Sequence, residues 1–234
     1  TLSLTYRCNA RCEMCYVWKK DSEKEKQREM KLEHIERLAA SRFMRRLVAL
    51  GLTGGETFLY EQLPEVIELF CRYGPPRYVS LATNGFLPER TKEIVRSILE
   101  HQPVELWVNV SVDALDELHN QIRGLPNVLE RTKKTLETLA EMRKDYPQLG
   151  VGILFTLQPQ NYSQMVDVFH YARRLGVQFN MNPINYGEEY YERDPGVVFK
   201  EYSRMLPEIE EQLRQIDRES PDDLFGREFR ALFR

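Results

Sequence analysis

Three cysteines lie close together near the start of the chain, in the run Cys-Asn-Ala-Arg-Cys-Glu-Met-Cys. Cys8, Cys12 and Cys15 follow an apolar, strand-like segment, so that one short loop supplies three thiolates. A four-iron, four-sulfur (4Fe-4S) cluster that is held by three thiolates keeps one iron open to a further ligand. A structural metal site, by contrast, usually has four protein ligands. The triad therefore predicts a metal centre with an open position for a ligand that the protein does not supply.

Two simpler interpretations of the triad stay open at this point. The three thiols could form half of a zinc site, or two of them could form a disulfide. The nearest candidates for a fourth zinc ligand are poor, because His34 follows a long charged stretch and Cys71 lies in a helical pattern beside Phe70. We expect Cys71 to be a buried core thiol. Four cysteines in 234 residues, three of them clustered, are not typical of a disulfide framework.

The composition is ordinary for a soluble globular protein, with 42% hydrophobic and 29% charged residues. A length of 234 residues allows one large α/β domain with a substantial core. The net charge of −3 gives no reason to expect nucleic acid or an anionic membrane as a partner. No apolar run is long enough to cross a bilayer and no secretory signal is visible. We expect a cytoplasmic location, because an exposed low-potential cluster on the three thiolates would be vulnerable to oxidants outside the reducing cytosol.

Strand-like and helix-like segments alternate along the chain. Amphipathic helical patterns separate the strand-like runs, which cover residues 2–6, 47–52, 78–83, 106–112, 151–157 and 178–182. Six strand–helix units predict a parallel sheet with right-handed crossovers. Because a closed eight-unit barrel typically needs about 250 residues, six units indicate an α/β fold, a partial and open (β/α)6 TIM-like barrel.

The sequence further predicts how the chain is divided. We assign residues 1–185 to the barrel, and we expect residues 186–234 to form a C-terminal helical extension and a polar tail. Apolar residues at helical spacing between Val198 and Ile216 indicate the helix of this extension. The densely charged stretch 19–30 is expected to be a solvated loop before the first helix.

Polar or glycine-rich sequence follows every predicted strand. In parallel barrels the C-terminal ends of the strands form one rim, where the chemistry gathers. The rim segments are the cysteine loop, Thr53-Gly54-Gly55-Glu56, Thr83-Asn84-Gly85, Ser111-Val112-Asp113, Gln158-Pro159-Gln160-Asn161 and Asn182-Pro183-Ile184-Asn185. Any one segment could be simple turn chemistry. Together they predict a polar rim that faces the cysteine loop.

The cysteine spacing, together with Gly54-Gly55-Glu56 after the second strand, resembles the radical SAM superfamily, whose enzymes generate a 5′-deoxyadenosyl radical from S-adenosylmethionine (SAM). The resemblance covers about residues 2–185. In that family the Gly-Gly-Glu segment contacts the amino group of SAM. The residue types suit this role, because glycines allow close backbone approach and a carboxylate accepts hydrogen bonds from an ammonium group. The alternative for Gly-Gly-Glu alone is a tight turn.

The same resemblance implies further contacts to the cofactor on the fourth strand and after it. Ser111 and Asp113 match positions that the family uses near the ribose and methionine of SAM, although Asp113 could instead be the N-cap of a helix from Ala114. The stretch His119 to Gly124 resembles one in SPASM-type members, in which the arginine, here Arg123, engages the SAM carboxylate. His119 itself is expected to be a surface or capping residue.

Three more polar or aromatic residues are candidates with an open alternative. Asn84 is a candidate for a cofactor or substrate contact, or else a turn residue. Tyr16, next to the last cysteine of the triad, could pack beside the adenine. Asn161 either contributes to the adenine site or caps the helix that follows it.

The resemblance also implies a reaction and its partners. Cys8, Cys12 and Cys15 would hold a 4Fe-4S cluster, SAM would chelate the open iron, and a low-potential donor such as flavodoxin or ferredoxin would supply an electron. The radical would take hydrogen from a peptide or a small molecule, and SAM cleavage itself needs no protein acid or base. The branch with SPASM or twitch-type maturases looks most similar, although no cysteine follows Cys71. The alternative from another class is an iron–sulfur or zinc-binding module without SAM chemistry.

Overall fold

The computed structural model describes residues 1–20, 22–184 and 195–220. Its centre is a six-stranded sheet in which the strands lie side by side in chain order and every neighbouring pair is parallel. The strands are β1 (Leu2–Thr5), β2 (Ala49–Gly54), β3 (Tyr78–Thr83), β4 (Glu105–Ser111), β5 (Leu149–Leu157) and β6 (Gln178–Pro183). Because β1 and β6 are the two edges, the sheet is not closed.

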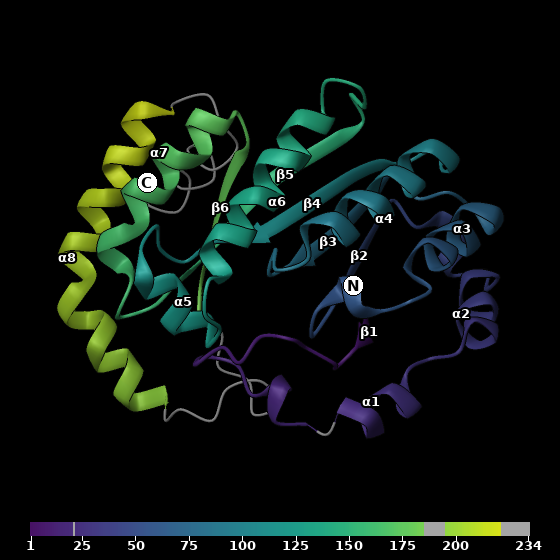
Figure 1. Ribbon diagram of the computed structural model, residues 1–234, viewed down its shortest axis with the longest axis horizontal. Coiled ribbons are helices and arrows are strands. Elements are labelled where there is room, and N and C mark those ends of the chain that lie inside the picture. The colour runs from purple at the N-terminus through teal and green to yellow at the C-terminus, as the bar shows by residue number, and fades with distance from the viewer. Residues whose placement is uncertain (21, 185–194, 221–234) are drawn as a thin grey trace.

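The helices lie on the outer side of this sheet and form an arc around it. Figure 1 shows the arc running from α2 and α3 through α4 and α6 to α7 and α8. The helices are α1 (Ser22–Arg28), α2 (Leu32–Ala39), α3 (Leu63–Tyr73), α4 (Pro88–His101), α5 (Glu117–Arg123), α6 (Val128–Met142), α7 (Met165–Leu175) and α8 (Pro195–Glu219), with 3-10 turns η1 (Val17–Lys19), η2 (Met44–Arg46), η3 (Thr57–Leu59) and η4 (Tyr162–Gln164). The predicted α/β fold, an open partial barrel of six parallel strands, is confirmed.

The two faces of the sheet differ in burial, as β4 illustrates. Successive side chains of a strand point to opposite faces. Leu106, Val108 and Val110 are fully buried in the main core, whereas Trp107 and Ser111 on the other face are only partly buried. Burying an aliphatic side chain of this size contributes about 1.5–3 kcal/mol. The buried face therefore fixes the strands against the helices, and the other face is left to line the inside of the open barrel.

The second strand and the charged stretch differ from the sequence prediction. β2 begins at Ala49 rather than at residue 47, because η2 takes up the residues just before it. The expectation of a loop over 19–30 is wrong, since residues 22–28 form α1. Acidic residues in the first turn of α1 and basic residues in its last turn match the helix dipole. Glu25 is buried and pairs with Arg28 at 3.1 Å, which a fully solvated loop would not provide.

The final helix packs against the barrel. Ile209, Leu213 and Ile216 of α8 are buried in the same core as the sheet, and Nε2 of His170 on α7 lies 2.8 Å from Oε2 of Glu219. Two parts of the predicted C-terminal region lie outside the described residues: 185–194, which include Asn185 and most of the connection to α8, and 221–234, most of the predicted polar tail. The domain boundary at 185 stays a prediction. None of the described helices is long and apolar enough to cross a membrane.

Candidate cofactor site

The start of the cysteine loop is held against the end of β2 by two glycines. The Gly55 amide donates to the Thr5 carbonyl at 2.7 Å, and the Glu56 amide donates to the Arg7 carbonyl at 2.8 Å. A Cβ on Gly55 would lie 2.2 Å from the Arg7 oxygen, and a Cβ on Gly54, whose φ is 141°, would lie 2.0 Å from the Thr5 oxygen. Only glycine permits this approach. The two glycines therefore fix where the cysteine loop leaves the sheet.

A methyl group at Gly55 is expected to displace the cysteine loop. We predict that Gly55→Ala lowers the free energy of unfolding by about 3 kcal/mol, because backbone atoms must move to relieve the overlap, and that it also lowers iron uptake on reconstitution. Gly176→Ala is the matched control, since Gly176 has a φ of 65° but a Cβ there meets nothing within 4 Å. The control should cost about 1–2 kcal/mol and leave iron uptake unchanged. Equal iron uptake by the two variants would contradict this account.

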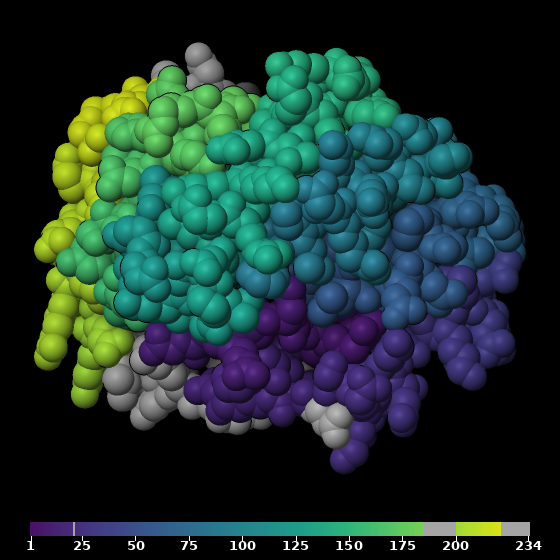
Figure 2. All heavy atoms as spheres, viewed as in Figure 1, coloured from purple at the N-terminus to yellow at the C-terminus, as the bar shows by residue number. Residues whose placement is uncertain are grey.

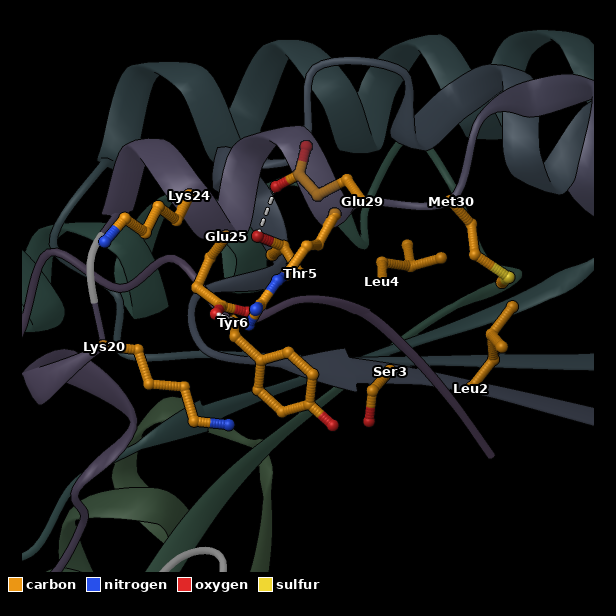
Figure 3. Close-up of a pocket in the computed structure, with 11 residues that line it drawn as sticks. Leu2, Ser3, Leu4, Thr5, Tyr6, Lys20, Lys24, Glu25, Glu29 and Met30 are labelled. Atoms are coloured by element: carbon orange, nitrogen blue, oxygen red, sulfur yellow. Dashed lines mark hydrogen bonds and ion pairs between the residues drawn. The ribbon is translucent and has the colours of Figure 1, made fainter.

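Side chains on the outer side of β1 brace the same segment. Nε of Arg7 donates to Glu29 at 2.8 Å, its Nη2 donates to the Leu59 carbonyl at 2.9 Å, and the Thr5 hydroxyl also donates to Glu29. Figure 3 shows Thr5 and Glu29 in a cavity of about 650 Å³ between β1 and α1. No predicted site residue lines this cavity, so it is separate from the candidate site.

The middle of the cysteine loop rests on the C-terminal end of α5. The Arg11 amide donates to the Arg123 carbonyl and the Glu13 amide to the Ile122 carbonyl, both at 2.9 Å. The last carbonyls of a helix have no hydrogen-bond donor within the helix. At the end of α5 these carbonyls therefore accept hydrogen bonds from the cysteine loop. A Cβ on Gly124, whose φ is 63°, would lie 2.4 Å from the Arg11 oxygen. In Figure 2 the purple N-terminal segment lies directly against the teal middle of the chain.

The N-cap of α5 is Asp116, and this excludes the capping alternative for Asp113. The Asp116 side chain accepts a hydrogen bond from the Leu118 amide at 3.0 Å, so it satisfies one of the free donors of the first turn. Asp113 lies before this turn and is fully buried. Its carboxylate has a different set of partners.

Asp113, Arg123 and Cys12 form a buried chain of polar contacts. Nη2 of Arg123 lies 2.7 Å from Oδ2 of Asp113, and Nη1 of Arg123 lies 3.8 Å from Sγ of Cys12. The Thr156 amide donates to Oδ1 of Asp113 at 3.0 Å. Burial works to lower the pKa of Arg123, but the neighbouring Asp113 carboxylate and Cys12 outweigh it, and the pKa is raised. The guanidinium is therefore a permanent positive charge beside the thiol of Cys12.

Glu56 is buried, and its carboxylate is bound within the protein. It accepts hydrogen bonds from the Thr83 hydroxyl at 2.8 Å, the Asn84 amide at 2.8 Å and the Phe58 amide at 3.1 Å. Burial raises its pKa, while these three donors act in the opposite direction. The Asn84 side chain in turn donates to Oδ1 of Asn9 in the cysteine loop at 2.7 Å. Glu56 thus links the ends of β2 and β3 and, through Asn84, reaches the loop.

A cavity of about 230 Å³ lies where these contacts meet. It brings together every predicted site residue except Glu56, Asp113, Tyr16 and Asn161. The lining residues are Cys8, Ala10, Cys12, Met14, Cys15, Val17, Trp18, Thr53, Gly54, Gly55, Ala82, Thr83, Asn84, Ser111, Arg123, Leu154 and Thr156. Three thiols, one buried cation and the ends of four strands therefore face one space.

Thr156 is a polar lining residue that the sequence did not point to. Thr53, Ser111 and Thr156 line the cavity, and their hydroxyls make no hydrogen bond within the described part of the chain. Thr156 lies between the buried residues Phe155 and Leu157 on β5. Its side chain therefore points to the other face of the strand, the one that lines the inside of the barrel. A polar residue that interrupts an apolar strand near its C-terminal end is the signal that could have found it. Free hydroxyls at a rim are available to a ligand.

Two candidates lie outside the lining of the cavity. Asn161 is fully buried, and its Nδ2 donates to the carbonyls of Asp113 and Thr156 at 3.0 Å each. Tyr16 does not line the cavity, and Nζ of Lys19 lies 3.7 Å from the centre of its ring. The proposed adenine contacts of both residues stay predictions.

His119 is a buried support of the same segment. Its Nδ1 accepts a hydrogen bond from the Asp113 amide at 3.1 Å, and burial lowers its pKa to about 3. The expectation of a surface residue is therefore wrong. Ile122 and Arg123 on the same helix are buried as well.

The cysteines fit a multi-iron centre better than the simpler alternatives. All four are free thiols, so no disulfide joins them. Burial raises the pKa of each triad thiol, that of Cys8 to about 12. No group of three or more His, Cys, Asp or Glu side chains in the described part of the chain could hold one metal ion, which disfavours zinc. In an iron–sulfur cluster the thiolates are spread over several irons. Cys71 is only partly buried and packs on the main core, away from the cavity.

The sequence of residues 2–172 matches the profile of the radical SAM superfamily. The chain belongs to this superfamily. Among related radical SAM proteins, the antilisterial bacteriocin subtilosin biosynthesis protein AlbA of Bacillus subtilis (strain 168) is 25% identical over 179 residues, which are 76% of this chain and 37% of that protein. An AdoMet-dependent heme synthase of Methanosarcina barkeri (strain Fusaro / DSM 804) is 33% identical over 162 residues, 66% of this chain and 42% of that protein.

A solved structure shares the fold. The protein anSMEcpe, determined with bound AdoMet and a peptide, superposes with a TM-score of 0.63 at 22% identity, covering 88% of this chain and 57% of that chain. This radical SAM chain spans roughly half, or less, of the length of the relatives described here. This structural match shows the fold of the described barrel.

Proposed function

We propose that this chain is the core of a radical SAM enzyme, in which Cys8, Cys12 and Cys15 hold a 4Fe-4S cluster and the cavity beside them holds SAM. The observation that supports this most is the convergence of three free thiols, a buried guanidinium and unused hydroxyls on one cavity. A plain electron carrier needs the thiols but has no use for a polar cavity next to them. The alternative of a module without SAM chemistry is therefore disfavoured.

The donor set fits the proposed cluster in charge as well as in number. Thiols in a site that raises their pKa remain protonated unless a metal or a cation stabilises the thiolates. Arg123 supplies a fixed positive charge at Cys12, and the glycines keep the loop against the sheet. When bound, the cluster and SAM together supply a 5′-deoxyadenosyl radical for hydrogen abstraction. The chain's own part is to hold, orient and shield these groups.

The residues proposed to hold SAM fall into two groups. Ser111 and the glycines of Gly54-Gly55 line the cavity, as do the hydroxyls of Thr53 and Thr156 that the structure adds to the set. Glu56 and Asp113 lie behind the lining, and we propose that they act by fixing Asn84 and Arg123 in place. This division separates contact with the cofactor from support of the residues that make the contact.

The substrate and the electron donor are proposed at the level of chemical class. The sheet is open between β1 and β6, so a substrate as large as a peptide could reach the barrel from the side. One related protein takes part in bacteriocin biosynthesis, and one protein of the same fold was determined with a peptide. Another relative is a heme synthase, so a small molecule is the second candidate. A low-potential donor such as flavodoxin or ferredoxin would deliver the electron.

SAM affinity of the reconstituted protein tests the cofactor site. We expect Ser111→Ala to bind SAM about ten-fold more weakly or worse, because a lost hydrogen bond to a charged group costs about 1.5–3 kcal/mol. Ser163→Ala is the matched control, since Ser163 is exposed and outside the cavity. Equilibrium binding of labelled SAM under anaerobic conditions measures both variants. Equal affinity of Ser111→Ala and wild type, with iron content unchanged, would remove Ser111 from the site.

A further inference from the structure

The guanidinium of Arg123 is enclosed by the protein. The residue is 6% exposed, one of its terminal nitrogens lies against the Asp113 carboxylate, and the other donates to Sγ of Cys12. Its Nε and Nη2 are buried and make no hydrogen bond among the described residues, so the contact of Nη2 with Asp113 is an ion pair. A planar guanidinium held at one edge by a carboxylate cannot turn freely. Its direction toward Cys12 is therefore set by the fold.

Cys12 differs from the other two triad cysteines in this respect. Within the described part of the chain, no charged side chain donates a hydrogen bond to the sulfur of Cys8 or Cys15. Cys12 is the most buried of the three, and its sulfur receives a donor from a charged side chain. Arg123 also fixes the backbone next to Cys12, because its carbonyl accepts from the Arg11 amide. One residue thus holds the loop and contacts the sulfur.

We propose that Arg123 is a positioning residue that raises the reduction potential of the cluster by donating a hydrogen bond to the Cys12 thiolate, with Asp113 holding the donor in line. The inference rests on the proposed function, since it needs a cluster on this thiolate. Hydrogen bonds to ligand sulfurs stabilise the more negative, reduced state of an iron–sulfur cluster. The Asp113 carboxylate opposes the charge of Arg123, so a variant that removes both charges together isolates the contribution of the hydrogen bond.

The family resemblance implies a different task for the same residue, a contact with the SAM carboxylate. The two tasks make different demands. A residue that binds only the carboxylate affects SAM affinity and leaves the potential of the cluster without SAM unchanged. A residue that bonds Cys12 affects the potential in the absence of SAM.

An EPR-monitored redox titration of the reconstituted protein without SAM tests the proposal, with dithionite as the one-electron reductant. The variant is Arg123→Met with Asp113→Asn, which removes both charges together and leaves no donor at Cys12. The midpoint potential is expected to shift downward relative to wild type. Arg11→Gln, which removes the charge of an exposed arginine on the same loop, is the matched control and should leave the midpoint unchanged. If the double variant takes up no iron, Arg123→Lys should show a smaller downward shift, because lysine keeps the charge but lacks the planar fork.

The outcomes separate the inference from the proposed function. An unchanged midpoint in a loaded variant at Arg123, with weaker SAM binding, would overturn the inference and leave the carboxylate contact in its place. A wild-type protein that takes up no iron under anaerobic reconstitution would overturn the proposed function, and the inference with it.

Discussion

Alanine at any one of Cys8, Cys12 and Cys15 is expected to abolish stable loading of the cluster, whereas Cys71→Ala is expected to load iron as wild type does. The triad thiols face one cavity, while Cys71 lies on α3 and packs against the main core. Each triad thiolate would hold its own iron, so no remaining thiol can replace the lost one. Iron and sulfide content after anaerobic reconstitution, together with the visible absorbance of the cluster, measures the effect.

Cys71→Ala is the control for the triad because it also removes a thiol that burial has shifted, in this case to a pKa of about 11. General damage from losing a cysteine should therefore appear in it as well. Loss of iron in Cys71→Ala, with normal iron in Cys15→Ala, would contradict the assignment of the ligands. One equivalent of zinc in the wild-type protein, with no cluster absorbance, would contradict the proposed function.

Asp113→Ala is expected to lower the free energy of unfolding of the metal-free protein by about 3–5 kcal/mol, the usual cost of leaving one charge of a buried ion pair without its partner. The variant leaves Arg123 buried and unpaired and removes the acceptor of the Thr156 amide. Chemical denaturation followed by circular dichroism measures the loss.

The control for Asp113→Ala is the double variant Asp113→Asn with Arg123→Met, which removes both charges and retains an oxygen that can accept from Thr156. It is expected to lose much less stability, because replacing a whole buried pair by neutral groups is often close to neutral. If the double variant is as unstable as Asp113→Ala, the pair is not the source of the effect.

The sequence predicted the fold and the place of the site because both depend on regular patterns. Parallel strands must bring their C-terminal ends to one edge, so the segments after β1, β2, β3 and β4 had to meet. The cysteine spacing and Gly54-Gly55 could be found in the same way, since each is a local pattern with a steric or chemical reason. A Cβ at either glycine would overlap with backbone atoms of residues 5–7, so the glycines reflect the close approach of the chain after β1 to the end of β2.

The support of the site could not be predicted, because it depends on contacts between distant parts of the chain. The carboxylates of Glu56 and Asp113 look alike in sequence as possible cofactor contacts, yet each is buried behind the lining with partners from other strands. His119 reads as a surface residue until the packing of α5 is known. Helix α1 was missed because it contains no apolar residue, so that only its acidic first turn and basic last turn favour a helix.

The central claim is that the triad and its cavity cleave SAM reductively, and the formation of 5′-deoxyadenosine tests it most directly. The protein is reconstituted with iron and sulfide under anaerobic conditions, given SAM and dithionite, and the products are separated by chromatography, with Cys12→Ala treated in parallel. We predict that wild type forms 5′-deoxyadenosine and methionine in equal amounts and that Cys12→Ala forms neither. A wild-type protein that carries a full cluster and binds SAM but forms no 5′-deoxyadenosine would contradict the claim.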